Sequence, residues 1–264
     1  MEQVGFWHFA HSYVRGNWAN SSTSTFSLLA KCCHDVDLIC WWMDCKCTQV
    51  SSFGSLNHFN SRNSPEGAAA RCLDCAAEAS CPYSARKIYL QSVESGSTAW
   101  PLTAVCDPID IENVTSALRH GPYGRCVYDC DNDVCDNQAV NMQFANGAIA
   151  TLSMVATTAS IGDRSTRIFG SLGQLIVEDH RTVHHYDFCT QERHVYAPKD
   201  TRPPEATSGF GHGGADWGLM EAFVDAVALD DPTLITSESA SAVASHLLTF
   251  EAEKSRLESR VVSL

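Results

Sequence analysis

Two runs of alternating apolar and polar residues, separated by an Asn-Gly turn, constrain the fold of this chain most strongly. The first run covers 139–144 and the second covers 149–155, with Asn146-Gly147 between them. Alternation with a period of two is typical of a half-buried strand, and Asn-Gly favours the tight turn of a hairpin. The sequence therefore predicts an antiparallel hairpin here.

Further periodicities extend this prediction. A second hairpin is expected from 166–170 and 174–178, with additional strands at 184–188 and 193–196. Apolar residues recur at three- and four-residue steps over 27–42, which indicates a helix, and two more helices are expected at 216–228 and 237–258. The mixture of aromatic and β-branched residues at 4–10 reads as a strand. Together these predict an α+β fold with an open, mostly antiparallel or mixed sheet and helices on one face.

Composition limits the class of protein. The chain has 264 residues, 44% of them hydrophobic, with 18 basic and 31 acidic residues and a formal charge of −13. This acidity argues against nucleic acid or anionic membrane as a partner. No apolar run reaches the roughly 18 residues of a membrane span, and the first residues lack the features of a signal peptide. We therefore expect a cytoplasmic protein whose thirteen cysteines are mostly reduced thiols.

The first candidate site lies on the predicted helix at 27–42. Lys31, His34 and Asp35 fall within two helical turns, and such a group can transfer protons near neutral pH because each member tunes its neighbours. The alternative is a solvated face of paired charges. We take Lys31, His34 and Asp35 as the candidate catalytic residues.

Two further segments are candidates for binding a polyhydroxylated ligand. The first supplies hydrogen-bonding and stacking groups in His11, Arg15, Asn17 and Trp18, although a purely structural role is an alternative. The second is a glycine-rich segment containing His212 and ending at Asp216, where glycines let the backbone approach a ligand. Asp216 could equally cap the helix that follows it.

Four cysteines form a candidate metal site. Cys72 and Cys75 have the C-x-x-C spacing of a zinc knuckle, Cys81 follows six residues later, and Cys126 is a candidate fourth ligand. The alternatives are a structural zinc and a set of free buried thiols. No G-x-G-x-x-G turn opens the chain, so we expect no dinucleotide-binding domain within 1–264.

With these residues in place, the chain resembles the C-terminal domain of the Gfo/Idh/MocA oxidoreductases. The resemblance rests on short segments in a fixed order, namely 11–18, 30–37, 52–56, 65–68, 71–83, 131–134, 169–173 and 212–216. It implies a single substrate-binding and oligomerisation domain over 1–264, acting on the CH–OH groups of a sugar or polyol. His34 matches the histidine of the family's D-x-x-x-H motif, whereas Ala30 stands at the aspartate position.

The resemblance also implies partners. In such enzymes an N-terminal Rossmann domain binds NAD or NADP, so this chain is expected to be inactive alone, as a truncated gene product or as the partner of a separate Rossmann chain. A homo-oligomer formed through the sheet face is expected. The alternative is a non-catalytic sugar-binding or oligomerisation module, with or without a stabilising zinc.

Overall fold

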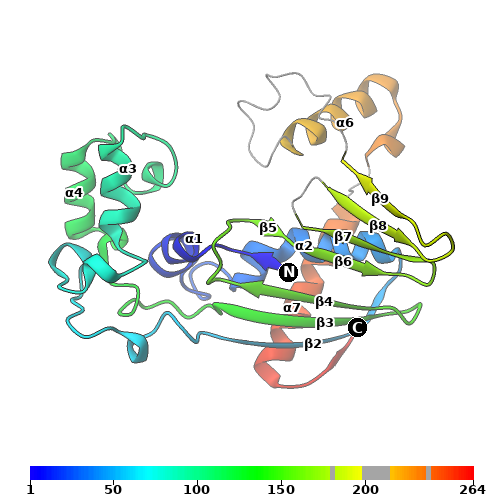
Figure 1. The fold of residues 1–264 in the computed structure, drawn as a ribbon, viewed down its shortest axis with the longest axis horizontal. Helices are drawn as coiled ribbons and strands as arrows, with labels where there is room; N and C mark the ends of the chain where they lie inside the picture. Colours follow the sequence, from blue (N-terminus) through cyan, green and yellow to red (C-terminus); the bar gives the residue numbers. More distant parts are fainter. Residues whose placement is uncertain (179–181, 198–214, 236–238) are drawn as a thin grey trace. The chain divides into compact units, whose positions relative to one another are not determined.

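The computed structural model describes residues 1–178, 182–197, 215–235 and 239–264 (Figure 1). The chain divides into two compact units. The first consists of residues 1–165 and 246–264, and the second of residues 166–245. Each unit contains its own sheet.

The first unit contains a six-stranded sheet in the order β10-β2-β3-β4-β1-β5. All neighbours are antiparallel except β1 and β4, which run parallel, so the sheet is mixed. The strands are β1 (Glu2–Gln3), β2 (Cys47–Ser55), β3 (Asn137–Phe144), β4 (Ile149–Val155), β5 (Asp163–Arg164) and β10 (Val262–Ser263). The predicted α+β class with open sheets is confirmed.

The hairpin of β3 and β4 confirms the strongest sequence prediction. Its register pairs Asn141 with Thr151, and Gly147 adopts a φ of 86° in the turn. Glycine suits this position because a side chain strains the left-handed backbone region. Val140, Met142 and Phe144 alternate onto the buried face of the sheet.

Helices cover that buried face. Helix α2 (Ser27–Met43) buries Leu28, Cys32, Val36 and Ile39, and helix α7 (Ser239–Glu258) contributes Leu248 and Ala252 to the same core. Figure 1 shows α2 and α7 on one side of β2, β3 and β4. The opposite face of these strands exposes Phe53 and Ile149, at 72% and 73% of their surface.

The prediction of a strand at 4–10 is wrong. After the two-residue β1, the chain forms helix α1 (Phe6–Phe9) and then the π-helical turn η1 (Ala10–Arg15). The buried residues Phe9, Ala10, Tyr13 and Val14 recur at helical spacing. Aromatic content favoured a strand locally, but burial of this face against the core decides the conformation.

The segment between β2 and β3 consists of short helical pieces around a second small core. That core contains Cys72, Ala85, Tyr89, Leu102, Val114, Leu118 and Tyr123. The pieces are η2 (Ser61–Asn63), η3 (Cys72–Asp74), η4 (Glu78–Ser80), η5 (Arg86–Leu90), α3 (Gln91–Glu94), η6 (Leu102–Ala104), α4 (Ile111–His120) and η7 (Pro122–Gly124).

The second unit holds a four-stranded antiparallel sheet in the order β6-β7-β8-β9. Its elements are β6 (Thr166–Phe169), β7 (Gly173–Val177), β8 (Val183–Asp187), β9 (Arg193–Tyr196), α6 (Ala215–Leu229) and η9 (Pro232–Leu234). The predicted second hairpin is thereby confirmed, with Arg167 opposite Ile176.

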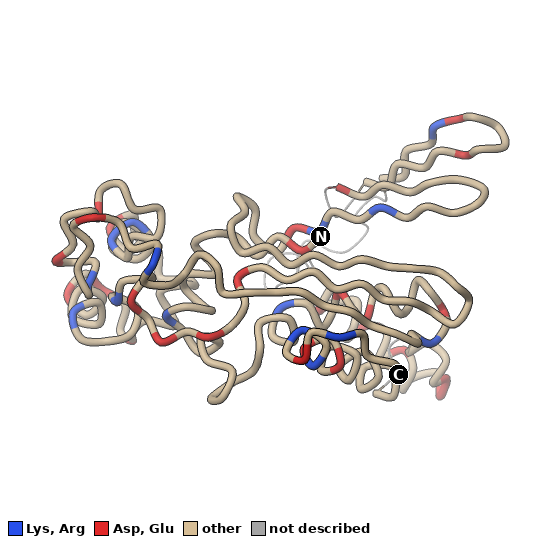
Figure 2. The backbone as a smooth tube through the Cα atoms, turned by 90° about the horizontal axis from the view of Figure 1, so that it is seen from below, with Lys and Arg blue, Asp and Glu red and all other residues tan. Residues whose placement is uncertain are grey.

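Figure 2 shows basic and acidic residues scattered along the backbone in no regular order. This scatter accords with the expectation that nucleic acid is not a partner, which stays a prediction. Within the described ranges, every helix is too short or too polar to span a bilayer.

Candidate active site on helix α2

Helix α2 presents its candidate residues in two directions. Asp35 is buried, Lys31 is partly buried, and His34 is exposed to solvent. The Asp35 side chain points inward because it lies beside the core residues Cys32 and Val36 on the helix. These two residues belong to the apolar stripe that packs on the sheet. The three predicted catalytic residues therefore occupy different environments.

Lys31 and Asp35 take part in a buried charge network with Glu2 and Arg164. Lys31 Nζ lies 3.1 Å from Glu2 Oε1, and Arg164 Nε lies 2.7 Å from Asp35 Oδ1 and 3.5 Å from Glu2 Oε2. Glu2 is completely buried in the strand β1. Two carboxylates and two cations therefore alternate, so that each buried charge has an opposite neighbour.

Burial and the charges of the network determine the direction in which the pKa of Glu2 is shifted. Burial raises the pKa of the Glu2 carboxyl, the nearby Asp35 raises it further, and Lys31 and Arg164 act in the opposite direction. Sequence analysis missed both Glu2 and Arg164. They are distant in sequence from α2, and only the pairing of β1 with β5 brings them to it.

His11 and Arg15 are not at the surface. His11 is 2% exposed, its Nδ1 lies 2.8 Å from the hydroxyl of Tyr89, and its ring stacks on Tyr123. Burial lowers the pKa of His11 to about 4, so the ring is neutral at neutral pH. Arg15 is 4% exposed. Both residues therefore support the fold of η1, while Asn17 and Trp18 are exposed.

An aromatic cluster beside these residues was also missed. Trp100 packs 5.2 Å from Trp7, 5.3 Å from His8 and 5.3 Å from His11, measured between ring centroids, and remains 47% exposed. Burial lowers the pKa of His8 to about 4, and the cation of Lys31 contributes to this shift. The cluster was missed because residues 4–10 were predicted to form a strand. Trp7, His8 and His11 come together only in a helical conformation.

The remaining ligand-binding candidates belong to the second unit. Asp216 lies in the first turn of α6 and is partly buried. His212 lies outside the described residues. Their roles stay predictions.

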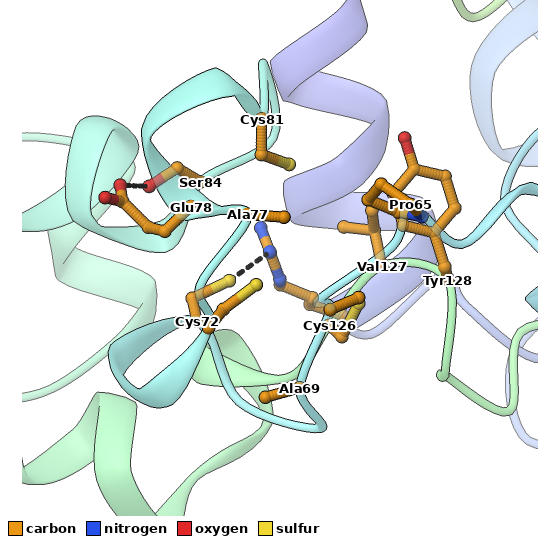
Figure 3. Close-up of a pocket in the computed structure, with 13 residues that line it drawn as sticks. Pro65, Ala69, Cys72, Ala77, Glu78, Cys81, Ser84, Cys126, Val127 and Tyr128 are labelled. Carbon is orange, nitrogen blue, oxygen red and sulfur yellow. Dashed lines mark hydrogen bonds between the residues drawn. The ribbon is translucent and has the colours of Figure 1, made fainter.

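The four candidate metal ligands line a single cavity (Figure 3). Cys72, Cys75, Cys81 and Cys126 share it with Arg15, whose Nη2 lies 3.3 Å from Cys72 Sγ. Across the described ranges, however, no group of three or more His, Cys, Asp or Glu side chains is arranged to hold a metal ion. The expected zinc site is thus not supported as a preformed centre. All thirteen cysteines are free thiols.

The join between the first strand and the first helix lacks the glycine-rich turn that cradles a pyrophosphate in dinucleotide-binding domains. The join between β1 and the short helix α1 contains one glycine, Gly5, and a Cβ there would lie 2.5 Å from Ile161 and 3.1 Å from the carbonyl oxygen of Ser160. Gly5 is therefore a packing position against Ile161 and Ser160.

Residues 3–252 match the sequence profile of the oxidoreductase family, C-terminal alpha/beta domain, abbreviated GFO_IDH_MocA_C. The chain belongs to this family, as the resemblance predicted.

Individual relatives support the assignment. A protein of Bacillus subtilis (strain 168) named "Putative oxidoreductase YteT" is 24% identical over 227 residues, which cover 83% of this chain and 50% of that protein. Levoglucosan dehydrogenase, solved with NADH and levoglucosan, superposes with a TM-score of 0.57 at 13% identity, covering 100% of this chain and 57% of that one.

A further solved structure, aldose-aldose oxidoreductase from Caulobacter crescentus complexed with glycerol, has a TM-score of 0.54 at 9% identity. It covers 100% of this chain and 54% of that one. At these identities the superpositions show a shared fold. The chain spans about half the length of the relatives it matches.

Proposed function

We propose that this chain supplies the substrate-binding half of an NAD(P)-dependent dehydrogenase acting on a CH–OH group of a sugar or polyol. Membership of the oxidoreductase family supports the reaction class. The names of the structural relatives, levoglucosan dehydrogenase and aldose-aldose oxidoreductase, support a carbohydrate substrate. NAD or NADP would be held by a nucleotide-binding domain of the same polypeptide or of a separate chain.

The observation that carries this proposal is the difference in environment between the candidate residues on α2. Lys31 and Asp35 are held on the inner side by Glu2 and Arg164, whereas the His34 side chain is exposed. An imidazole nitrogen of His34 accepts the proton of the substrate hydroxyl, because imidazole exchanges protons readily near neutral pH. Lys31 and Asp35 act as positioning residues that fix the helix under His34.

Exposed side chains near η1 complete the proposed substrate surface. Trp18 offers an aromatic face to the apolar side of a sugar ring, and the Asn17 amide offers a donor and an acceptor for hydroxyl groups. His212 and Asp216 stay candidate substrate contacts on the basis of the sequence. The buried His11 and Arg15 contribute by supporting the segment that carries Asn17 and Trp18.

The test compares the chain alone with the chain joined to, or mixed with, its nucleotide-binding partner. The chain alone should not oxidise a panel of sugars and polyols with NAD or NADP, because hydride transfer needs the nicotinamide held against the substrate carbon. In the active assembly, His34→Asn should lower kcat by about 10²- to 10⁴-fold with little change in KM. The matched control is His120→Asn, at the end of the distant helix α4. Unchanged turnover in His34→Asn would refute the proposed role.

The alternative function is a non-catalytic sugar-binding module. The absence of the motif aspartate, replaced by Ala30, favours it because the proton relay lacks a member. Calorimetric sugar binding by the chain, with no turnover in any assembly with a nucleotide-binding partner, would establish this alternative.

We also propose that the exposed face of β2, β3 and β4 forms a homo-oligomer. Phe53 and Ile149 both project from this face. Light scattering of the chain should show an oligomer that the double variant Phe53→Ser, Ile149→Ser converts to a monomer.

A further inference from the structure

Cys72 and Cys75 lie at the two ends of one tight turn. Cys72 begins the 3-10 helix η3, and the backbone N–H of Cys75 donates to the carbonyl oxygen of Cys72 at 3.4 Å. A 3-10 helix rises about 2.0 Å per residue, so Cα atoms three residues apart are about 6 Å apart and their side chains lie one above the other. A disulfide spans Cα separations of about 4.4 to 6.8 Å. The backbone of this turn therefore already has the spacing that a disulfide between Cys72 and Cys75 needs.

The side chains of these two cysteines line the same cavity. In Figure 3 a dashed line joins the sulfur of Cys72 to a guanidinium nitrogen, which belongs to Arg15. The other contact of Cys72 Sγ is long, at 3.9 Å from the carbonyl oxygen of Arg125. Cys75 Sγ likewise lies 3.9 Å from the carbonyl oxygen of Gly67. Thiols are weak hydrogen-bond donors, so these contacts do not hold the two sulfur atoms apart.

Arg15 places a positive charge beside Cys72. Its Nη2 donates to Cys72 Sγ at 3.3 Å and to the carbonyl oxygen of Tyr83 at 2.8 Å. Its Nε donates to the carbonyl oxygen of Arg125 at 2.8 Å, so the guanidinium is fixed in this position. A guanidinium beside a sulfur atom stabilises the negative charge that develops when the thiol reacts. Cys72 is therefore placed to act as a nucleophile towards a neighbouring sulfur.

Access to the cavity favours Cys75 as the first thiol to react. The cavity has a volume of about 20 Å³, which is room for one water molecule, so a larger oxidant reaches only a thiol that is also exposed to solvent. Cys75 is partly exposed, whereas Cys72 is 8% exposed. Burial raises the pKa of the remaining two thiols of the cavity, Cys81 and Cys126, which keeps them protonated and less reactive.

We propose that Cys72 and Cys75 form a reversible disulfide by exchange with glutathione disulfide. Cys75 Sγ attacks one sulfur of glutathione disulfide, the bond between the two glutathione sulfurs breaks, and the departing glutathione takes up the proton that Cys75 loses. Cys72 Sγ then attacks Cys75 Sγ, the bond between Cys75 and the second glutathione breaks, and this glutathione takes up the proton that Cys72 loses. Two electrons thus pass from the two cysteines to glutathione disulfide, which is reduced to two thiols.

The test treats the whole native chain with glutathione disulfide, blocks the remaining thiols with N-ethylmaleimide and locates each modification by mass spectrometry. Trypsin cuts after Arg71 and Arg86, so Cys72, Cys75 and Cys81 lie on one peptide. That peptide should carry a single maleimide, at Cys81, and should lack the two hydrogen atoms lost on forming the disulfide. Treatment with dithiothreitol should restore three thiols that react with maleimide.

The exposed thiol of Cys189 serves as the internal control, since glutathione disulfide is added until this residue is modified. Glutathione on Cys189, with Cys72 and Cys75 both still reacting with maleimide, would overturn the proposal. A disulfide that joins either cysteine to another partner, or that forms only in the urea-unfolded chain, would overturn it as well.

Variants test the order of the two steps. Cys72→Ser should stop the reaction after the first step, so that glutathione stays bound to Cys75. Cys75→Ser should leave the buried Cys72 reduced. The matched control is Cys81→Ser, which alters the third thiol of the same peptide and should still form the disulfide. Cys75 free of glutathione in a folded Cys72→Ser chain would refute the proposed order, and a misfolded variant leaves the result on the unmodified chain decisive.

Discussion

Lys31 Nζ lies 3.1 Å from the Oε1 atom of Glu2, a carboxylate that has no exposed surface. The first strand of the fold thus places a negative charge directly beneath the helix that carries the candidate catalytic histidine. This pair holds Lys31 in place, so we expect any contribution of Lys31 to His34 to be electrostatic and positional.

The charge network should depend strongly on Arg164. Arg164→Met would leave the buried Asp35 and Glu2 with only Lys31 as a counter-charge, so the free energy of unfolding should fall by about 3 kcal/mol. Glu2→Gln should cost less, about 1 kcal/mol, since burial already favours the neutral form of Glu2. Urea titration measures both values. Arg260→Met, which removes an exposed ion pair with Glu258, is the control and should change stability by at most about 0.5 kcal/mol.

Stability should decline as the pH falls from 6.5 towards 4. Burial lowers the pKa of His8 and of His11 from 6.5 to about 4, so in this window the unfolded chain binds protons that the folded chain does not. Each imidazole adds at most about 1.4 kcal/mol per pH unit to the slope. Glu2, whose pKa is raised, opposes this trend above 4.5, because there the folded chain holds the extra proton.

Urea titrations at several pH values measure this dependence. His8→Gln and His11→Gln should each flatten it, and the exposed His120→Gln should not. An unchanged slope in both buried-site variants would contradict the prediction.

Gly124 should tolerate no side chain. A Cβ at this position would lie 1.8 Å from the carbonyl oxygen of Leu118, in backbone that cannot move aside easily. Gly124→Ala should therefore destabilise the first unit by about 3 kcal/mol. Gly96→Ala provides the comparison: its φ is 86° but its surroundings are open, so about 1 kcal/mol of backbone strain is expected. Thermal unfolding distinguishes the two, and equal losses would show that the contact with Leu118 relaxes.

Asp136 should be a strong structural determinant of the turn after β2. Its carboxylate accepts hydrogen bonds from the backbone N–H groups of Asn57, His58 and Phe59 at 3.1, 2.6 and 3.2 Å. Asp136→Asn would place an amide among these donors, so the expected loss of stability is about 2 kcal/mol. Asp131→Asn removes an exposed carboxylate from its pair with Arg125 and should change stability little, by at most about 0.5 kcal/mol. Chemical denaturation of the two variants provides the measurement.

Sequence patterns predicted the elements whose signals are local. The Asn146-Gly147 hairpin and the helix α2 have, respectively, a turn dipeptide and an apolar periodicity within one short window. At 4–10 the local composition favoured a strand, and the prediction failed because the buried positions Phe9, Ala10, Tyr13 and Val14 follow a helical period.

Only part of the candidate site could be predicted from sequence patterns. His34, Lys31 and Asp35 share one helix, as predicted, but Asp35 is buried and Lys31 partly buried while His34 is exposed. Glu2 and Arg164 join them through strand pairing, which no local pattern encodes. His11 and Arg15 were expected at a ligand surface because their side chains are polar, yet both are buried with hydrogen-bond partners. Cys72, Cys75, Cys81 and Cys126 line one cavity, but within the described ranges they do not form the metal site that their spacing predicted.

The parallel pairing of β1 with β4 has a kinetic consequence. Glu2 joins Met154 across about 150 residues of chain, and Val262 joins Val50 across about 210. Closing such long loops is entropically unfavourable and slows folding. The inner hairpin can assemble from residues that are close in sequence, but the sheet reaches its full width only when β10 pairs with β2. Until then the edge of β2 that β10 covers stays open to mispairing.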